Sequence, residues 1–222
     1  ALGVTRDNVA SAGFFDARGA PLGAIGAPPE GREGLGLYDS EGEARGVVSM
    51  QPGGAFALQF HGPDGQPRLL LGTSGDGVPA LGMRDAAGVA RVALALDREG
   101  APSISFQDAG AKGGALLGVT DDGGAVLEFV DARGVLRGAT GLSPAGAPSM
   151  SLRDEQGNKR LAMGVAPDGA VTLFFVDAEG VPQASLAAQP GNMPGLSFYG
   201  KKGDTLAVLG VNLDQHVIDG GS

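Results

Sequence analysis

Acidic residues recur along the chain at one fixed phase, 46 residues apart, which could place them together in a folded repeat. They are Glu30, Asp76, Asp122, Asp168 and Asp214. In a closed ring of repeats these carboxylates would surround one opening, where carboxylate oxygens can hold Ca²⁺. A Ca²⁺ loop needs several oxygens close together in sequence, and only Asp121-Asp122 offers such a pair. We therefore interpret the set as turn residues and predict no metal site.

Arginines occupy a second fixed phase, 23 or 46 residues apart, at Arg45, Arg68, Arg91, Arg137 and Arg160. Asp39 stands six positions before Arg45, and the same spacing recurs in other units. Across a hairpin loop this spacing can place the two side chains opposite each other. We predict exposed ion pairs that contribute roughly 0.2–1 kcal/mol each. Anion binding by the arginine row is the functional alternative.

Catalytic chemistry would need partners that the sequence does not supply. Glu128 is the one acidic residue at an alternating strand position, where other units have Gly, Gln, Ser or Phe. Five-bladed glycoside hydrolases use paired carboxylates as acid and base, and one carboxylate is not a pair. We interpret Glu128 as a charge that balances Arg84, Arg153 or Lys201, and we predict no catalytic residue.

Metal, cofactor and thiol chemistry has equally little support. The chain has no Cys, which excludes disulfides, thiolate nucleophiles and Cys-ligated metals. Its two histidines, His61 and His216, are far apart in sequence and lack a companion ligand motif. No phosphate-binding glycine loop opens a helix, because no helix is predicted. We expect neither a metal nor a cofactor.

A 23-residue repeat positions all of these side chains. Its anchor is the apolar residue two before a recurring Asp: Phe14, Leu37, Phe60, Met83, Phe106, Phe129, Leu152, Phe175 and Phe198. The steps contain no insertion or deletion. Nine such units and a partial one therefore form a single predicted domain, residues 1–222.

Each unit reads as two strands joined by turns. Alternation of apolar residues, as in Leu127-Glu128-Phe129-Val130-Asp131, predicts a strand with one inward face. An Asp-x-x-Gly turn such as Asp131 to Gly134 follows, and a second turn closes the unit at positions such as Asp76-Gly77. Small residues at the other alternating positions, such as Gly72, suggest that both faces of the sheet are buried.

A second period of 46 residues gives four strands per unit, the size of a β-propeller blade. We predict an all-β repeat protein of antiparallel hairpins, arranged as a five-bladed propeller closed by both termini. The blades would span about 25–68, 71–114, 117–160, 163–206, and 209–222 together with 1–22. The alternative is an open meander or solenoid of 23-residue hairpins.

Composition narrows the function classes. Gly and Pro number 41 and 14, which borders on the composition of disordered chains, but 42% of residues are hydrophobic and only 18% are charged. The net charge of −9 argues against nucleic acid or anionic lipid as the main partner. No apolar run is long enough to span a membrane. The chain begins at Ala1 in the middle of the pattern, so we expect that an upstream segment, such as a signal or an anchor, was removed or is absent from this chain.

Five units of four strands resemble the tachylectin type of five-bladed propeller, a sugar-binding lectin with one site per blade. The repeated sites of those lectins rely on aromatic residues, whereas this chain has no Trp and only two Tyr. The repeat text itself, Leu-x-Phe-x-Asp-x-x-Gly-x-x-Arg, is similar to repeats in uncharacterised bacterial proteins that often carry an N-terminal membrane anchor. That resemblance implies extracytoplasmic display and no particular activity.

Departures from the repeat are scattered aromatic residues rather than converging polar ones, at Phe15, Tyr38, Phe56, Phe174 and Tyr199. We take these as a candidate interaction surface. The leading hypothesis is a non-catalytic structural or protein-binding module, an accessory or scaffold subunit of a larger complex. That complex would be periplasmic, extracellular or attached to a membrane surface. A glycan-binding lectin is the alternative, and a five-bladed glycoside hydrolase is the third hypothesis.

Overall fold

The computed structural model describes residues 1–4, 10–26, 34–50, 54–188 and 194–210. Within these ranges the chain forms β-strands and no helix. The chain divides into two units, Ala1–Ala111 and Lys112–Ser222. The predicted single domain over residues 1–222 stays a prediction.

The first unit contains ten strands. They are β1 (Leu2–Val4), β2 (Ala10–Phe15), β3 (Pro21–Gly26), β4 (Gly34–Tyr38), β5 (Ala44–Met50), β6 (Phe56–His61), β7 (Pro67–Thr73), β8 (Pro79–Arg84), β9 (Ala90–Leu96) and β10 (Pro102–Gln107). The second unit contains β11 (Gly114–Val119), β12 (Ala125–Val130), β13 (Leu136–Leu142), β14 (Pro148–Arg153), β15 (Lys159–Val165), β16 (Val171–Val176), β17 (Pro182–Ala188), β18 (Gly195–Tyr199) and β19 (Thr205–Gly210).

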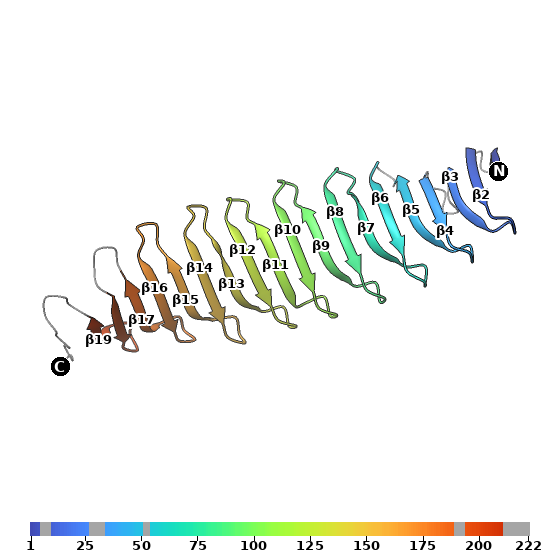
Figure 1. The fold of residues 1–222 in the computed structure, drawn as a ribbon. Helices are drawn as coiled ribbons and strands as arrows, with labels where there is room; N and C mark the ends of the chain where they lie inside the picture. The colour runs from blue at the N-terminus through green and yellow to red at the C-terminus, as the bar shows by residue number, and fades with distance from the viewer. Residues whose placement is uncertain (5–9, 27–33, 51–53, 189–193, 211–222) are drawn as a thin grey trace. The chain divides into compact units, whose positions relative to one another are not determined.

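Within each unit, every strand pairs in antiparallel fashion with the next strand along the chain (Figure 1). The result is a β-meander, since each strand lies beside the next one along the chain. The predicted all-β repeat of antiparallel hairpins is therefore confirmed.

The pairing continues through the positions where separate propeller blades were expected. Strand β6 pairs with β7 from Ala57↔Gly72 to His61↔Pro67, although one blade was predicted to end at residue 68. Strand β14 likewise pairs with β15 across the boundary predicted near residue 160. The described residues thus show an open meander within each unit, and the five-bladed ring is not shown.

Most of the described turns at both ends of the strands are of one type. In the Asp turn at 39–42, the backbone N–H of Gly42 donates to the carbonyl of Asp39 at 3.1 Å, and Asp39 N–H donates to Glu43 at 3.0 Å. Gly42 takes φ +85°, which glycine adopts without strain. The same position recurs from repeat to repeat, and at Ala111 it is filled by a residue other than glycine, at φ 54°. The repeat period expected from the sequence is thereby confirmed in the backbone.

The two faces of the meander differ sharply in composition. Residues paired across neighbouring strands lie on the same face, so the row Leu58, Leu71, Leu81, Leu94 and Ile104 lies on one side of the first unit. We call this side the apolar face. The opposite side, the small-residue face, carries Ala57, Gly72, Ala80 and Ala95 in a parallel row.

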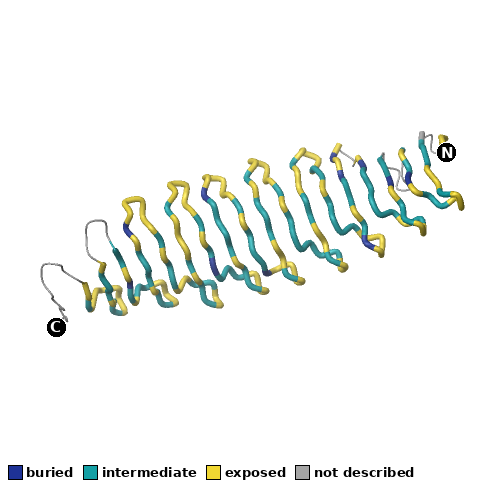
Figure 2. The backbone as a smooth tube through the Cα atoms, viewed as in Figure 1, coloured by how far each residue is buried: buried dark blue, intermediate teal, exposed yellow. Residues whose placement is uncertain are grey.

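Neither face is covered, contrary to the expectation from the small residues that both would be buried. Figure 2 shows buried residues only at scattered points along the strands. In the described part of the chain the buried apolar residues are Ala55, Ala57 and Ala170, and no large side chain is fully buried. A Cβ at Gly72 would collide with the backbone oxygen of Phe56. This glycine is therefore required by its own sheet, and it is not evidence of a second sheet.

Candidate interaction surface

The predicted ion pairs between Asp and Arg line the small-residue side of the Asp turns. Arg45 Nη2 lies 2.6 Å from Asp39 Oδ2, and Arg45 Nε donates to the same oxygen at 2.7 Å. The guanidinium also donates to the carbonyl of Gly62 in the next hairpin. Arg91, Arg137 and Arg160 make the corresponding ion pairs with Asp85, Asp131 and Asp154. The prediction is confirmed. Arg45, Arg137 and Arg160 also donate to a backbone carbonyl of the following hairpin.

Asp39 also organises the backbone of its own turn. Its Oδ1 accepts from the backbone N–H groups of Glu41 at 2.9 Å and Glu43 at 3.0 Å. Partial desolvation acts to raise the pKa of Asp39, but these hydrogen bonds and Arg45 outweigh it and hold the pKa below its ordinary value. The same balance at Asp131, with its backbone donors and Arg137, lowers the pKa to about 2.

A carboxylate is retained even where the repeat loses its Asp. Gly62 stands at the Asp position, and a Cβ there would lie 2.9 Å from Oδ1 of Asp64 and 2.7 Å from Nε of Arg68. Asp64 pairs with Arg68 at 2.6 Å and accepts from the backbone N–H of Gln66 at 3.2 Å. Asp64 therefore fills the space of the missing side chain and restores the ion pair. Sequence spacing alone missed this substitution, because the carboxylate moves by two positions.

The acidic phase predicted as turn residues lies in turns wherever it is described. Asp76 Oδ1 accepts from Ser74 Oγ at 2.5 Å, Asp122 Oδ1 from Thr120 Oγ1 at 2.6 Å, and Asp168 Oδ1 from Ala170 N–H at 3.0 Å. These bonds hold the pKa of Asp76 and of Asp122 below the ordinary value, chiefly through the Ser74 and Thr120 hydroxyls. Glu30 and Asp214 lie outside the described residues. In the second unit the turns of Asp122 and Asp168 are four strands apart, roughly 19 Å at about 4.8 Å per strand, too far to share an ion.

Among the described residues, the remaining titratable candidates do not gather into a metal-binding group. Glu128 is half-buried, and its cross-strand neighbours are Leu116 and Ala139, so no second carboxylate lies directly opposite. His61 Nε2 lies 3.3 Å from Gln59 Oε1. His216 is outside the described residues. Within the described ranges no three His, Asp or Glu side chains gather at metal-binding distance.

The five aromatic residues of the predicted interaction surface divide between the two faces. In the first unit, Phe15 and Tyr38 lie back over Gly13 and Gly36 on the small-residue face, whereas Phe56 is on the apolar face and 44% exposed. In the second unit, Phe174 pairs across from Ser185, whose Oγ is 2.9 Å from the Tyr199 hydroxyl. The structure thus gathers Phe174 and Tyr199 about Ser185, and it separates Phe56 from Phe15 and Tyr38.

On the small-residue face, large side chains cover the space beside several of the Asp turns. Phe15 and Tyr38 are each preceded, two residues earlier, by glycine, and a Cβ at Gly36 would lie 2.8 Å from the Tyr38 hydroxyl oxygen. Two repeats of the second unit reverse the order, because Glu128 precedes Val130 and Phe174 precedes Val176. The large side chain can therefore stand one residue before or one residue after the anchor residue of the repeat, and it covers the same space in both cases. Glu128 has this packing role in its repeat.

The apolar face is the largest feature that sequence reasoning missed. In the first unit the exposed large apolar residues on it are Leu2, Val4, Phe14, Ile25, Leu37, Met50, Phe56, Phe60, Leu71, Met83, Leu94, Leu96 and Phe106. In the second unit they are Leu117, Val119, Phe129, Leu142, Met150, Leu152, Met163, Val165, Val171, Phe175, Leu186, Phe198 and Leu209. No charged residue lies on this face among the described strands of either unit. On soluble monomeric proteins, contiguous exposed apolar patches are rarely larger than a few hundred Å².

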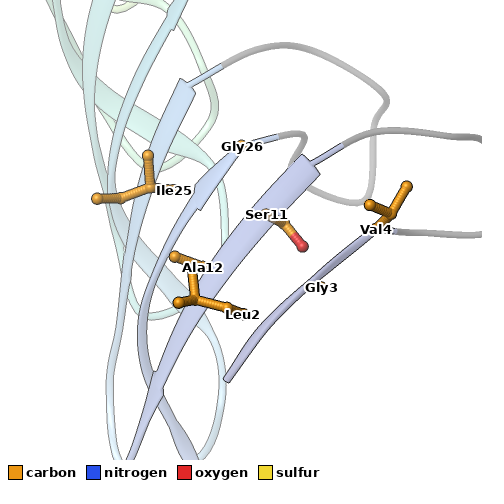
Figure 3. A pocket seen from close by; sticks show the side chains of 7 residues that line it. All are labelled: Leu2, Gly3, Val4, Ser11, Ala12, Ile25 and Gly26. Atoms are coloured by element: carbon orange, nitrogen blue, oxygen red, sulfur yellow. The ribbon is translucent and has the colours of Figure 1, made fainter.

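Hollows on the sheets are open and apolar. One of about 500 Å³ lies beside β1, lined by Leu2, Val4, Ala12 and Ile25 with Gly3, Ser11 and Gly26 (Figure 3). Ser11 offers its only side-chain hydroxyl. Enclosed ligand pockets carry several converging polar groups, so this hollow has the character of a contact surface. The described residues include no helix long and apolar enough to cross a membrane.

Comparisons with known proteins leave the family open. No family model matches the chain, and no curated protein matches it. Among solved structures, a "putative 6-phosphogluconolactonase" from Bacteroides uniformis aligns with 95% of this chain and 87% of its own, at 14% identity and a TM-score of 0.19. A similarity at that TM-score carries no argument about fold or function.

Proposed function

We propose that this chain is a non-catalytic structural module, an accessory or scaffold subunit that assembles with protein in a larger extracytoplasmic or membrane-associated complex. The observation that carries the proposal is the uncharged apolar face, present in both units. Burial of apolar surface is the main driving force of protein association.

For the arrangement of the repeats, we propose the open meander in preference to the five-bladed ring. Support comes from the continuous pairing of β6 with β7 and of β14 with β15. In a propeller, these positions would be gaps between blades, because each blade is a separate four-stranded sheet. An open sheet leaves its apolar face available to a protein partner.

The test compares two neighbouring residues on opposite faces in the chain isolated from its native source. Leu81→Glu places a charge on the apolar face, and Ala80→Glu places the same charge on the small-residue face. Native mass spectrometry should find wild type and Ala80→Glu in a complex and Leu81→Glu outside it. Recovery of the wild type as a free 22.0 kDa chain, or glycan-array binding that Leu81→Glu leaves intact, would contradict the proposal.

A further inference from the structure

We infer that the apolar face of residues 1–111 packs against the same face of a second copy of this chain, as the two sheets of a sandwich. The inference rests on the proposed function and names the partner. Two sheets packed face to face lie about 10 Å apart, with their inner side chains interdigitated. A twofold axis between the copies brings identical patches together, as in most homodimers.

The area available on this face is sufficient for a stable dimer. Thirteen large apolar side chains of the first unit are exposed on it, between 38% for Leu96 and 89% for Leu2. At roughly 80 Å² each, about half of a typical large side chain, they present on the order of 1,000 Å². A stable interface buries about 800 Å² on each partner. The face of this unit alone therefore meets the requirement.

The relief of the face is self-complementary. In the row nearest the Asp turns, bulky residues stand on the even-numbered strands at Phe14, Leu37, Phe60, Met83 and Phe106. Their partners on the intervening strands are Gly23, Gly46, Leu69 and Val92. In the next row, the exposed residues are instead on odd-numbered strands, at Ile25, Leu71 and Leu94. A second copy displaced by one strand can place its projections in these hollows, because both surfaces have the same period.

Charge does not prevent association with an identical partner in this geometry. Each chain has a net charge of −9, and like charges brought together oppose association. The described acidic side chains of the first unit lie in turns, as Asp39 and Asp85 do, and the small-residue face holds the arginine partners of these two. Face-to-face packing therefore leaves the charges at the solvated rim.

The experiment measures the mass of the purified full chain by sedimentation equilibrium at micromolar concentration. The wild type should give twice 22.0 kDa. Leu94→Glu should weaken self-association by at least about a hundredfold, because it would bury an unpaired charge. Ser105→Glu is the matched control on the small-residue face, where the next repeat already has Glu128 at the equivalent position, and it should leave the mass unchanged.

A second experiment introduces no charge into the fold and measures instead how accessible a single thiol is to a reagent. The chain has no Cys, so Leu94→Cys and Ser105→Cys each carry one thiol. The Leu94→Cys thiol should react slowly with a maleimide, and its reaction should become faster on dilution, because dilution dissociates the dimer. The Ser105→Cys thiol should react rapidly at every protein concentration. A wild-type mass of 22.0 kDa, or equal reactivity of both thiols, overturns the inference. If that monomer still joins a Leu81-dependent complex in the native source, the proposed function stands and only the second copy is wrong.

Discussion

The guanidinium of Arg45 lies 2.6 Å from the carboxylate of Asp39 and reaches the carbonyl of Gly62 in the following hairpin. One side chain therefore closes its own Asp turn and ties it to the next. Arg68 in the first unit, and Arg137 and Arg160 in the second, likewise donate to a backbone carbonyl of the following hairpin.

Replacing Arg45 with Ala should lower the melting temperature by a few degrees, because the Gly62 carbonyl and the Asp39 carboxylate both lose a donor. Arg45→Lys should recover only part of this loss, because an ammonium cannot reproduce the forked geometry of a guanidinium. Arg98→Ala is the control, since the Arg98 side chain is 84% exposed and 3.4 Å from Asp76. Thermal unfolding of the three variants is the measurement. Equal effects of Arg45→Ala and Arg98→Ala would show that the contacts of Arg45 with Asp39 and Gly62 do not stabilise the fold.

Acid should destabilise the fold through Asp131. Its pKa is lowered from 3.8 to about 2 in the folded state, so its stabilising contribution is complete above about pH 4 and is lost as the pH falls toward 2. Urea midpoints measured at pH 6, 4 and 2.5 should decline in the wild type over the lower interval. Asp131→Asn should start lower at pH 6 and decline less steeply. The exposed Asp121→Asn serves as control, and a wild-type decline unaltered by Asp131→Asn would count against the assignment.

The turn position of Ala111 offers a reciprocal pair of substitutions. Ala111 has φ 54° and makes the same turn hydrogen bond to Asp108 that Gly88 makes to Asp85. Ala111→Gly should stabilise the protein by about 1 kcal/mol, and Gly88→Ala, at φ +80°, should destabilise it by about 1–2 kcal/mol. A Cβ at Gly82 meets nothing within 4 Å, so Gly82→Ala should be neutral or slightly stabilising. Chemical denaturation measures all three, and the same sign for Ala111→Gly and Gly88→Ala would contradict the turn geometry.

Packing on the small-residue face should couple Gly36 to Tyr38. Gly36→Ala alone should destabilise the protein, because its Cβ would lie 2.8 Å from the tyrosine hydroxyl oxygen. Adding Tyr38→Val removes the obstruction and recreates the order found at Phe174 and Val176. A double-mutant cycle should give a favourable coupling of about 0.5–3 kcal/mol. Strict additivity of the two substitutions would show that the side chains at positions 36 and 38 do not compete for the same space.

Local features of this fold were predictable because short-range chemistry determines them. The Asp-x-x-Gly pattern predicted the turn at Asp39 and Gly42, and the six-residue spacing predicted the pair with Arg45. The covering of the sheet was not predictable. The small size of Gly72 suggested a neighbouring sheet, but the backbone of Phe56 in the same sheet explains it. The shift of a carboxylate from Gly62 to Asp64 was also hidden, because only the folded turn brings the two positions together.

Solvent access to the leucine methyl groups tests the central claim most directly. In the native assembly, a freely diffusing nitroxide should broaden the methyl signals of Leu22 and Leu206, which lie on the small-residue face and are 48% and 60% exposed. The methyl signals of Leu94 and Leu186, each 49% exposed on the apolar face of its unit, should be protected. Protection of Leu94 and Leu186 would establish that protein covers the apolar face. Broadening of all four residues to the same degree would show that the face stays in water and would contradict the account.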